Sequence, residues 1–209
     1  MLSDDDRTPC TRASIDICAE IPDTIMTHHS FEPAAVAALK PAINLVAENQ
    51  SHNAAIGDLH EKAFGPGRFT RAAFRLREQG PHDQSLSFVA LAQDDDRLIG
   101  SVRQTWIKTA RDSARGLLLG PLTIHPDAQN KGIGRTLAAH CIAAAGATDA
   151  HYVLLVGDQP YYGPLGFEVA PKGQVTLPGP VDENRLLVCP LGGFDPATLS
   201  GRVHHADLL

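Results

Sequence analysis

The stretch from Leu117 to Leu137 constrains the fold of this chain more than any other part of its sequence. It predicts a β-strand over 117–124, a Pro-Asp turn, and a helix that begins at two closely spaced glycines, Gly132 and Gly134. Glycine has no Cβ, so a ligand can approach the backbone closely at these positions. The N–H groups in the first turn of a helix have no partner within the helix and carry a partial positive charge. This turn is therefore a candidate anion site.

Two cations in the same turn support this interpretation. Lys131 and Arg135 stand where an isolated helix favours Asp or Glu, and a bound phosphate would compensate for their charge. Two common phosphate-binding motifs do not fit the stretch. A P-loop needs Lys and then Ser or Thr after its second glycine, but Gly134 is followed by Arg135 and Thr136. The dinucleotide fingerprint needs a third small residue where Leu137 stands.

The segment Gln129-Asn-Lys-Gly-Ile-Gly134 resembles the Gln/Arg-x-x-Gly-x-Gly/Ala motif of the GNAT superfamily, the acetyl-CoA-dependent N-acyltransferases. The resemblance extends through Leu122-x-Ile124-x-Pro126 before this motif and Tyr161-Tyr-Gly-Pro-Leu-Gly-Phe167 after it. It is strongest to bacterial acetyltransferases with a Tyr-Tyr-Gly-x-x-Gly-Phe segment. It implies an α/β (α+β) fold, in which a mixed, mostly antiparallel sheet is flanked by helices in a single domain. The glycine pair alone would also fit a tight turn that only lets the helix pack on the strand.

The remaining sequence predicts elements in the order that this fold requires. We expect an N-terminal extension over residues 1–40, a GNAT-like domain over 41–191 and a C-terminal tail over 192–209. Alternating or continuous apolar residues predict strands and periodic ones predict helices. The predicted strands are 42–48, 85–92, 98–108, 152–156, 167–170 and 184–189, and the predicted helices 53–64 and 68–79. In the GNAT fold the sheet opens between the strand before the glycine turn and the strand that ends at Val156.

Composition limits the classes of partner. The net charge is -6, which gives no support for binding nucleic acid or anionic membranes. No apolar run is long enough to cross a membrane, and the N-terminus is acidic, so we expect a cytoplasmic protein. The four cysteines form no CxxC pair and are expected to be reduced. The ten histidines show no metal-ligand spacing, so no metal is expected.

The resemblance also implies where acetyl-CoA would bind as a co-substrate. In this family the CoA pyrophosphate lies on backbone amides, here those of residues 130–135, and the pantetheine arm runs beside residues 122–124 as an added strand does. A backbone N–H near Ile124 would polarise the thioester carbonyl. The expected cofactor-binding residues are Leu122, Thr123, Ile124, Gln129, Asn130, Lys131, Gly132, Ile133, Gly134 and Arg135.

Tyr162 is the expected general acid, because it matches the tyrosine that many GNAT enzymes place beside the sulfur. Tyr161 is expected to pack in the core, and a core role for both tyrosines is the alternative. No general base follows from the resemblance, since Leu118 stands where histone-type members have glutamate. Asp158 and His125 are the local alternatives, although both residues also fit turns, and water could relay the proton.

The acceptor is expected to be a primary amine on a small molecule or peptide. Arg68, Arg71 and Arg75 share a helix face, which fits either contacts to an anionic acceptor or a solvated basic surface. Trp106 could line the acceptor pocket or belong to the core. A homodimer is plausible by analogy with the family. The alternative function is a GNAT-fold module that binds acyl-CoA without turnover.

Overall fold

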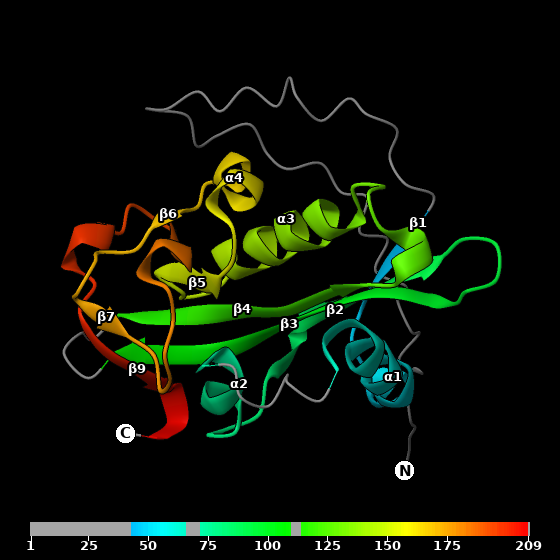
Figure 1. Ribbon diagram of the computed structural model, residues 1–209, viewed down its shortest axis with the longest axis horizontal. Helices are drawn as coiled ribbons and strands as arrows, with labels where there is room; N and C mark the ends of the chain where they lie inside the picture. Colours follow the sequence, from blue (N-terminus) through cyan, green and yellow to red (C-terminus); the bar gives the residue numbers. More distant parts are fainter. Residues whose placement is uncertain (1–42, 66–71, 110–113, 209) are drawn as a thin grey trace, which may run out of the picture. The chain divides into compact units, whose positions relative to one another are not determined.

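The computed structural model describes residues 43–65, 72–109 and 114–208. The predicted extension over residues 1–40 lies outside this part. Residues Leu39–Leu209 form one compact unit, built on a mixed sheet (Figure 1). Its strand order is β1 (Ile43–Ala47), β2 (Asp83–Ala92), β3 (Leu98–Thr109), β4 (Arg115–Ile124), β5 (Tyr152–Val156), β8 (Leu186–Pro190) and β6 (Glu168–Val169). All neighbours in this order are antiparallel except β4 and β5, which confirms the predicted fold class.

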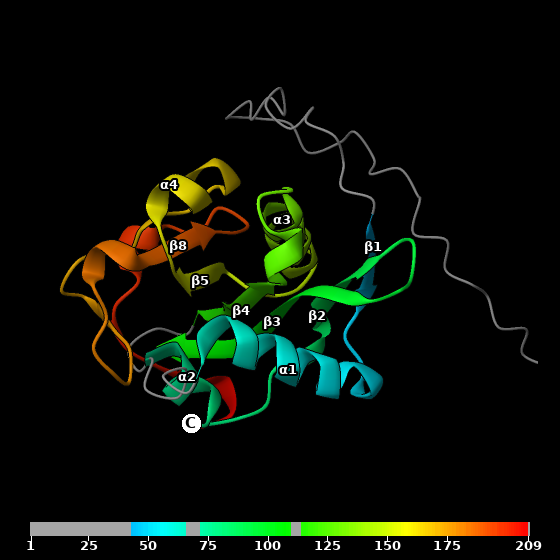
Figure 2. The same ribbon diagram turned by 45° about the vertical axis from the view of Figure 1, so that its right-hand side comes forward.

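Helices cover both faces of the sheet. The longest, α3 (Ile133–Gly146), lies on one face, and α1 (Asn53–Phe64) and α2 (Ala72–Arg77) lie on the other (Figures 1 and 2). Each longer helix buries an apolar stripe, as its periodicity predicts. The shorter helical segments are α4 (Gln159–Tyr162), η1 (Gln50–His52), η3 (Pro126–Ala128), η4 (Gly163–Leu165), η5 (Glu183–Arg185), η6 (Pro196–Thr198) and η7 (Ala206–Leu208).

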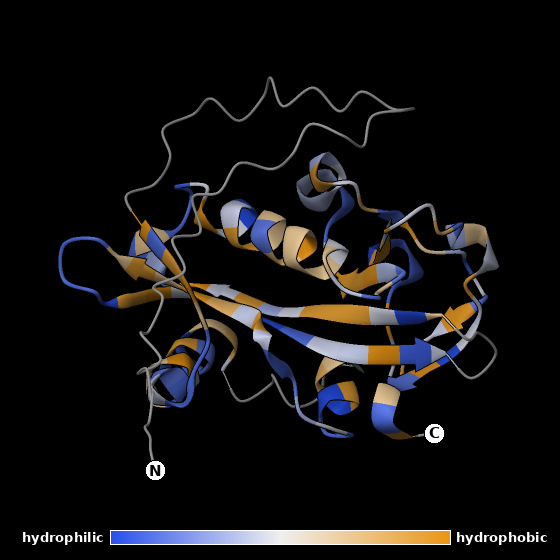
Figure 3. Ribbon diagram, turned by 180° about the vertical axis from the view of Figure 1, so that it is seen from behind, coloured by the Kyte–Doolittle hydropathy of each residue, from blue (hydrophilic) through white to orange (hydrophobic). Residues whose placement is uncertain are grey.

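Apolar residues run along the central strands, whereas the turn between β2 and β3 is hydrophilic (Figure 3). Tyr152, Val153, Leu154 and Leu155 of β5 are all buried, as predicted for a strand covered on both faces. The core is divided by the sheet, with one cluster under α3 and the other on the side of α2 and β9 (Gly201–His205). The sheet thus lies between two closely packed layers of side chains, one on each face.

The sheet opens where β4 separates from β5. Their pairing is limited to Gly116–Leu118 against Tyr152–Leu154, so residues 119–124 of β4 have no partner on β5. The opening matches the one that the resemblance implies. At the same place β4 is irregular against β3, because Leu122 pairs with Val102 but Leu119 pairs with Gln104. Residues 120 and 121 therefore form a bulge opposite residue 103.

The predicted C-terminal tail over 192–209 is instead part of the sheet. Strand β9 pairs with the end of β3 and with the short strand β7 (Val175–Thr176). Leu199, Val203 and His205 are buried. This stretch has one apolar residue among five in the strand, so its pattern gave no sign of a core element.

No helix in the described ranges is long and apolar enough to cross a membrane. Within the same ranges, no group of three or more His, Cys, Asp or Glu side chains is arranged to hold a metal ion.

Candidate active site

A cavity of about 720 Å³ lies at the opening between β4 and β5. The bulged segment of β4, residues 119–122, forms one side, together with the end of β5. Residues from α1, α2, the segment before β2, Arg103 of β3, Tyr162 of α4 and the segment before β8 complete the described lining. Its volume is in the range of sites for small ligands.

The glycine turn lies at the N-terminus of α3, and its backbone has the conformation that glycine favours. Asn130 and Gly132 have φ values of 61° and 79°. Gly132 is the N-cap residue, and a Cβ added there would meet nothing within 4 Å. The backbone N–H groups of residues 130–135 donate no hydrogen bond to any part of the described chain. These amides thus fit the predicted anion site.

Gly134 is constrained by packing as well as by any ligand. A Cβ at this position would lie 2.6 Å from the hydroxyl oxygen of Tyr161, and in ordinary contact with Ile124 and Leu122. The side chains of Leu122 and Ile124 therefore lie close to the turn. Packing thus contributes to the requirement for glycine at position 134, whereas Gly132 faces open space.

The polar side chains of the turn are exposed and make few contacts with the described chain. The Lys131 ammonium donates to the carbonyl of Asp127 at 3.0 Å, and the Gln129 amide donates to the carbonyl of Ile124 at 3.4 Å. The Arg135 guanidinium lies 5.3 Å from the centre of the Tyr161 ring. Neither contact neutralises the positive charge of these two side chains.

Tyr162 lines the cavity, whereas its neighbour Tyr161 packs against the glycine turn. The Tyr162 ring contacts those of Tyr161 and Phe167 edge-on, at 4.8 and 5.7 Å between centroids. Gly157 makes room for it, because a Cβ there would lie 2.4 Å from the ring. Burial, and to a lesser degree Tyr161 and Asp158, raise the pKa of Tyr162 to about 12. The hydroxyl is therefore protonated at neutral pH.

The two local alternatives for the base do not belong to the described cavity lining. Asp158 is exposed and pairs with Arg185, its Oδ1 lying 3.1 Å from Nε. His125 accepts a hydrogen bond from the backbone N–H of Asp127, as a turn residue does. Neither residue is among the described ones that line the cavity.

Of the other candidate contacts to the acceptor, Trp106 and Arg75 are described and do not line the cavity. Trp106 packs against the core and donates from Nε1 to Asp83 at 2.9 Å, so it has the core role. Arg75 is exposed, which supports the interpretation of a solvated basic surface. Arg68 and Arg71 lie outside the described residues.

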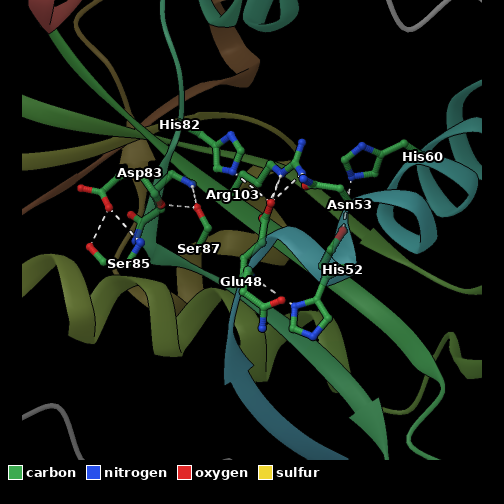
Figure 4. Close-up of polar contacts among 12 residues, drawn as sticks. Glu48, His52, Asn53, His60, His82, Asp83, Ser85, Ser87 and Arg103 are labelled. Atoms are coloured by element: carbon green, nitrogen blue, oxygen red, sulfur yellow. Dashed lines mark hydrogen bonds and ion pairs between the residues drawn. The ribbon is translucent and has the colours of Figure 1, made fainter.

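A buried polar cluster that the sequence did not reveal adjoins the cavity (Figure 4). The Glu48 carboxylate has no exposed surface and accepts hydrogen bonds from Arg103, through Nε at 2.9 Å and Nη2 at 2.6 Å. His82 Nε2 lies 3.0 Å from the same carboxylate. His82 and Arg103 line the cavity, as does His60 of α1. Burial alone would raise the pKa of Glu48, but the hydrogen bonds and charges of its two partners lower it to about 2.

The fold is shared with solved acetyltransferases. The GNAT family N-acetyltransferase YhbS of Escherichia coli, solved in complex with CoA, has a TM-score of 0.67 and 20% identity over 85% of this chain and 93% of that chain. A GNAT family acetyltransferase of Brucella melitensis, in complex with acetyl-CoA, has a TM-score of 0.59 and 21% identity over 79% of this chain and 96% of that one. No curated protein matches the sequence significantly. The profile of the acetyltransferase (GNAT) family matches residues 53–167, more than half of the sequence. The chain therefore belongs to the acetyltransferase (GNAT) family.

Proposed function

We propose that this protein is an N-acetyltransferase that moves the acetyl group of acetyl-CoA to a primary amine by direct transfer in a ternary complex. The observation that carries the proposal is the cavity where β4 leaves β5, with Tyr162 in its lining and the unpaired amides of the glycine turn nearby. The similar proteins solved with CoA and acetyl-CoA support the choice of co-substrate.

The backbone of β4 and the glycine turn fit the two ends of the co-substrate. The amides of residues 130–135 would receive the pyrophosphate, with Lys131 and Arg135 adding positive charge. Residues 122–124 lie on the part of β4 that has no partner on β5, so the pantetheine arm would pair there as an added strand. This arrangement directs the thioester toward the cavity.

Tyr162 would supply the proton that the departing thiolate needs. Its raised pKa keeps the proton on the hydroxyl until the C–S bond breaks. A tyrosine with a pKa of about 12 is a weaker acid than a free one, but a thiolate that forms in the same desolvated place is also a stronger base than in water. Desolvation thus weakens the acid and strengthens the base that receives its proton. These two effects offset each other, so the proton transfer remains feasible.

The cysteines favour direct transfer over an acyl-cysteine intermediate. Cys141 and Cys189 are buried, and neither belongs to the cavity lining. Burial raises the pKa of both thiols, to about 11 for Cys189, so neither forms a thiolate nucleophile at neutral pH. Cys10 and Cys18 lie outside the described residues.

An acceptor screen tests the proposal. The full chain is incubated with acetyl-CoA and a panel of small-molecule and peptide primary amines, and products are detected by CoA release and intact mass. We expect acetylation of at least one amine at a rate that depends on enzyme concentration. Tight acetyl-CoA binding without turnover on any amine would instead identify a non-catalytic acyl-CoA-binding module.

A further inference from the structure

We infer that His82 accepts the proton of the amine in this cavity, and that Glu48 is the positioning residue that holds it. This inference rests on the proposed transfer function. An ammonium group has no lone pair, and amines with pKa values of about 8 to 10 are mostly protonated at neutral pH. The enzyme therefore needs a base on the acceptor side of the thioester.

The other titratable groups at the cavity are less suited to this role. Tyr162 holds its proton up to a pH of about 12. Asp182 caps η5, where its Oδ1 accepts from the backbone N–H of Asn184 at 2.9 Å. His60 Nε2 lies 3.3 Å from the Ser101 hydroxyl, which is a weaker orienting partner than a carboxylate. Of the two described histidines in the lining, His82 has the Glu48 carboxylate as its partner, and the arginines there cannot act as bases.

The hydrogen bond to Glu48 selects the tautomer that a base needs. A carboxylate with a pKa of about 2 is ionised at any working pH and only accepts hydrogen bonds. Nε2 of His82 must therefore carry the proton, which leaves the lone pair on Nδ1. Nδ1 points away from Glu48 (Figure 4) and has no hydrogen-bond partner within the described chain. When Nδ1 takes a proton, the carboxylate stabilises the imidazolium, as in other carboxylate–histidine pairs.

Both neighbours of His82 are held by residues that are distant in the sequence. The backbone carbonyl of Pro81 accepts from Nε2 of His205 at 3.0 Å, and the side-chain carboxylate of Asp83 accepts from Nε1 of Trp106 at 2.9 Å. The hydrogen bond to Glu48 thus orients the imidazole ring, and the contacts of its two neighbours fix the segment that carries it. Such preorganisation is expected of a group that must meet a substrate at a defined position.

The proton balance of the step is complete. His82 takes one proton from the ammonium, the nitrogen lone pair bonds to the carbonyl carbon, the C–S bond breaks, and the sulfur takes the Tyr162 proton. The second proton of the nitrogen leaves as the amide forms and restores Tyr162, and the His82 proton passes to solvent. Among the described residues, the charged and titratable groups that line this cavity besides His82 are His60, Arg77, Arg103, Tyr162, Asp182 and Arg185, and Glu48 lies behind His82 and Arg103.

The test compares His82→Gln with wild type, using the best amine from the panel and an analogue of lower amine pKa. Glutamine can still donate to Glu48 but cannot take a proton. We expect kcat to fall on the order of a hundredfold, with unchanged acetyl-CoA affinity and thermal melting. The pH profile of kcat should also change, because the variant reacts only with amine that is already neutral. The loss should be much smaller for the amine of lower pKa, because more of that amine is already neutral.

Two further variants complete the design. His140→Gln makes the same chemical change on the exposed face of α3, outside the cavity lining, and should behave as wild type. His82→Ala with added imidazole should regain part of the lost rate. An unchanged pH profile in His82→Gln, or an equal loss for both amines, would overturn the assignment of His82 while leaving the transferase intact. A wild-type protein that acetylates no amine would overturn the proposed function itself, and this inference with it.

Discussion

At the scale of single residues, the Glu48 carboxylate connects three segments, because it binds Arg103 of β3 and His82 before β2 from its own position after β1. Removing its charge by Glu48→Gln leaves Arg103 without its carboxylate partner and should lower the free energy of unfolding by about 3 kcal/mol. The exposed Glu61→Gln on α1 is the matched control. Urea denaturation at pH 7 measures both, and equal stability of the two variants would contradict the prediction.

The same residue predicts a pH dependence. Its pKa in the folded protein, about 2, lies below the ordinary value of 4.5. The stabilisation is therefore fully present above about pH 4.5 and is lost as the pH falls toward 2. Wild type should thus lose more stability than Glu48→Gln between pH 5 and about pH 3. Parallel urea curves over this range check the sign.

Tyr162→Phe removes the proposed acid and keeps the ring that packs against Phe167. We expect kcat to fall on the order of a hundredfold, with acetyl-CoA affinity nearly unchanged, because the hydroxyl acts only as the thiolate leaves. Tyr161→Phe is the comparison, since that hydroxyl lies at Gly134 and outside the cavity lining. Steady-state kinetics of both variants test the assignment. A greater loss of kcat in Tyr161→Phe than in Tyr162→Phe would assign the acid to Tyr161.

At the scale of elements, sequence and structure agree best for one strand and one helix outside the glycine turn. Strand β5 and helix α1 have the bounds that were predicted, because continuous or periodic apolar residues end at clear turn residues. The Glu48 cluster could not be predicted in this way. His82 and Arg103 are 34 and 55 residues from Glu48, and only the register of β1, β2 and β3 brings them together.

The glycine turn at the N-terminus of α3 gives a prediction about acetyl-CoA binding. Gly134→Glu places a carboxylate at the proposed pyrophosphate site and should weaken acetyl-CoA binding by more than about a hundredfold. Gly134→Ala should lose less, since its methyl group disturbs only Tyr161. Gly57→Glu adds the same charge on α1, where a Cβ meets nothing within 4 Å, and should bind normally. Titration calorimetry with acetyl-CoA measures all three, and unchanged affinity in Gly134→Glu would exclude this placement.

At the scale of the whole molecule, strand β9 contacts the segment before β2 that lines the cavity. His205 of β9 is 2% exposed, and its ring packs on the Gly80 backbone beside His82. A histidine in a core position carries no signal that sequence periodicity can detect, which is why the predicted boundary at 191 left this strand out. The segment that holds the proposed base is therefore fixed by the end of the chain.

This coupling is measurable in a double-mutant cycle. Gly80→Ala would place a Cβ 2.5 Å from the His205 ring, so it should cost about 1 to 3 kcal/mol of unfolding free energy and lower kcat. In the His205→Ala background the ring is gone, and the same Gly80→Ala change should cost at least about 1 kcal/mol less. Urea denaturation of the four proteins gives the coupling energy. Additive costs would mean that the two residues do not act on each other, and that β9 does not position the segment carrying His82.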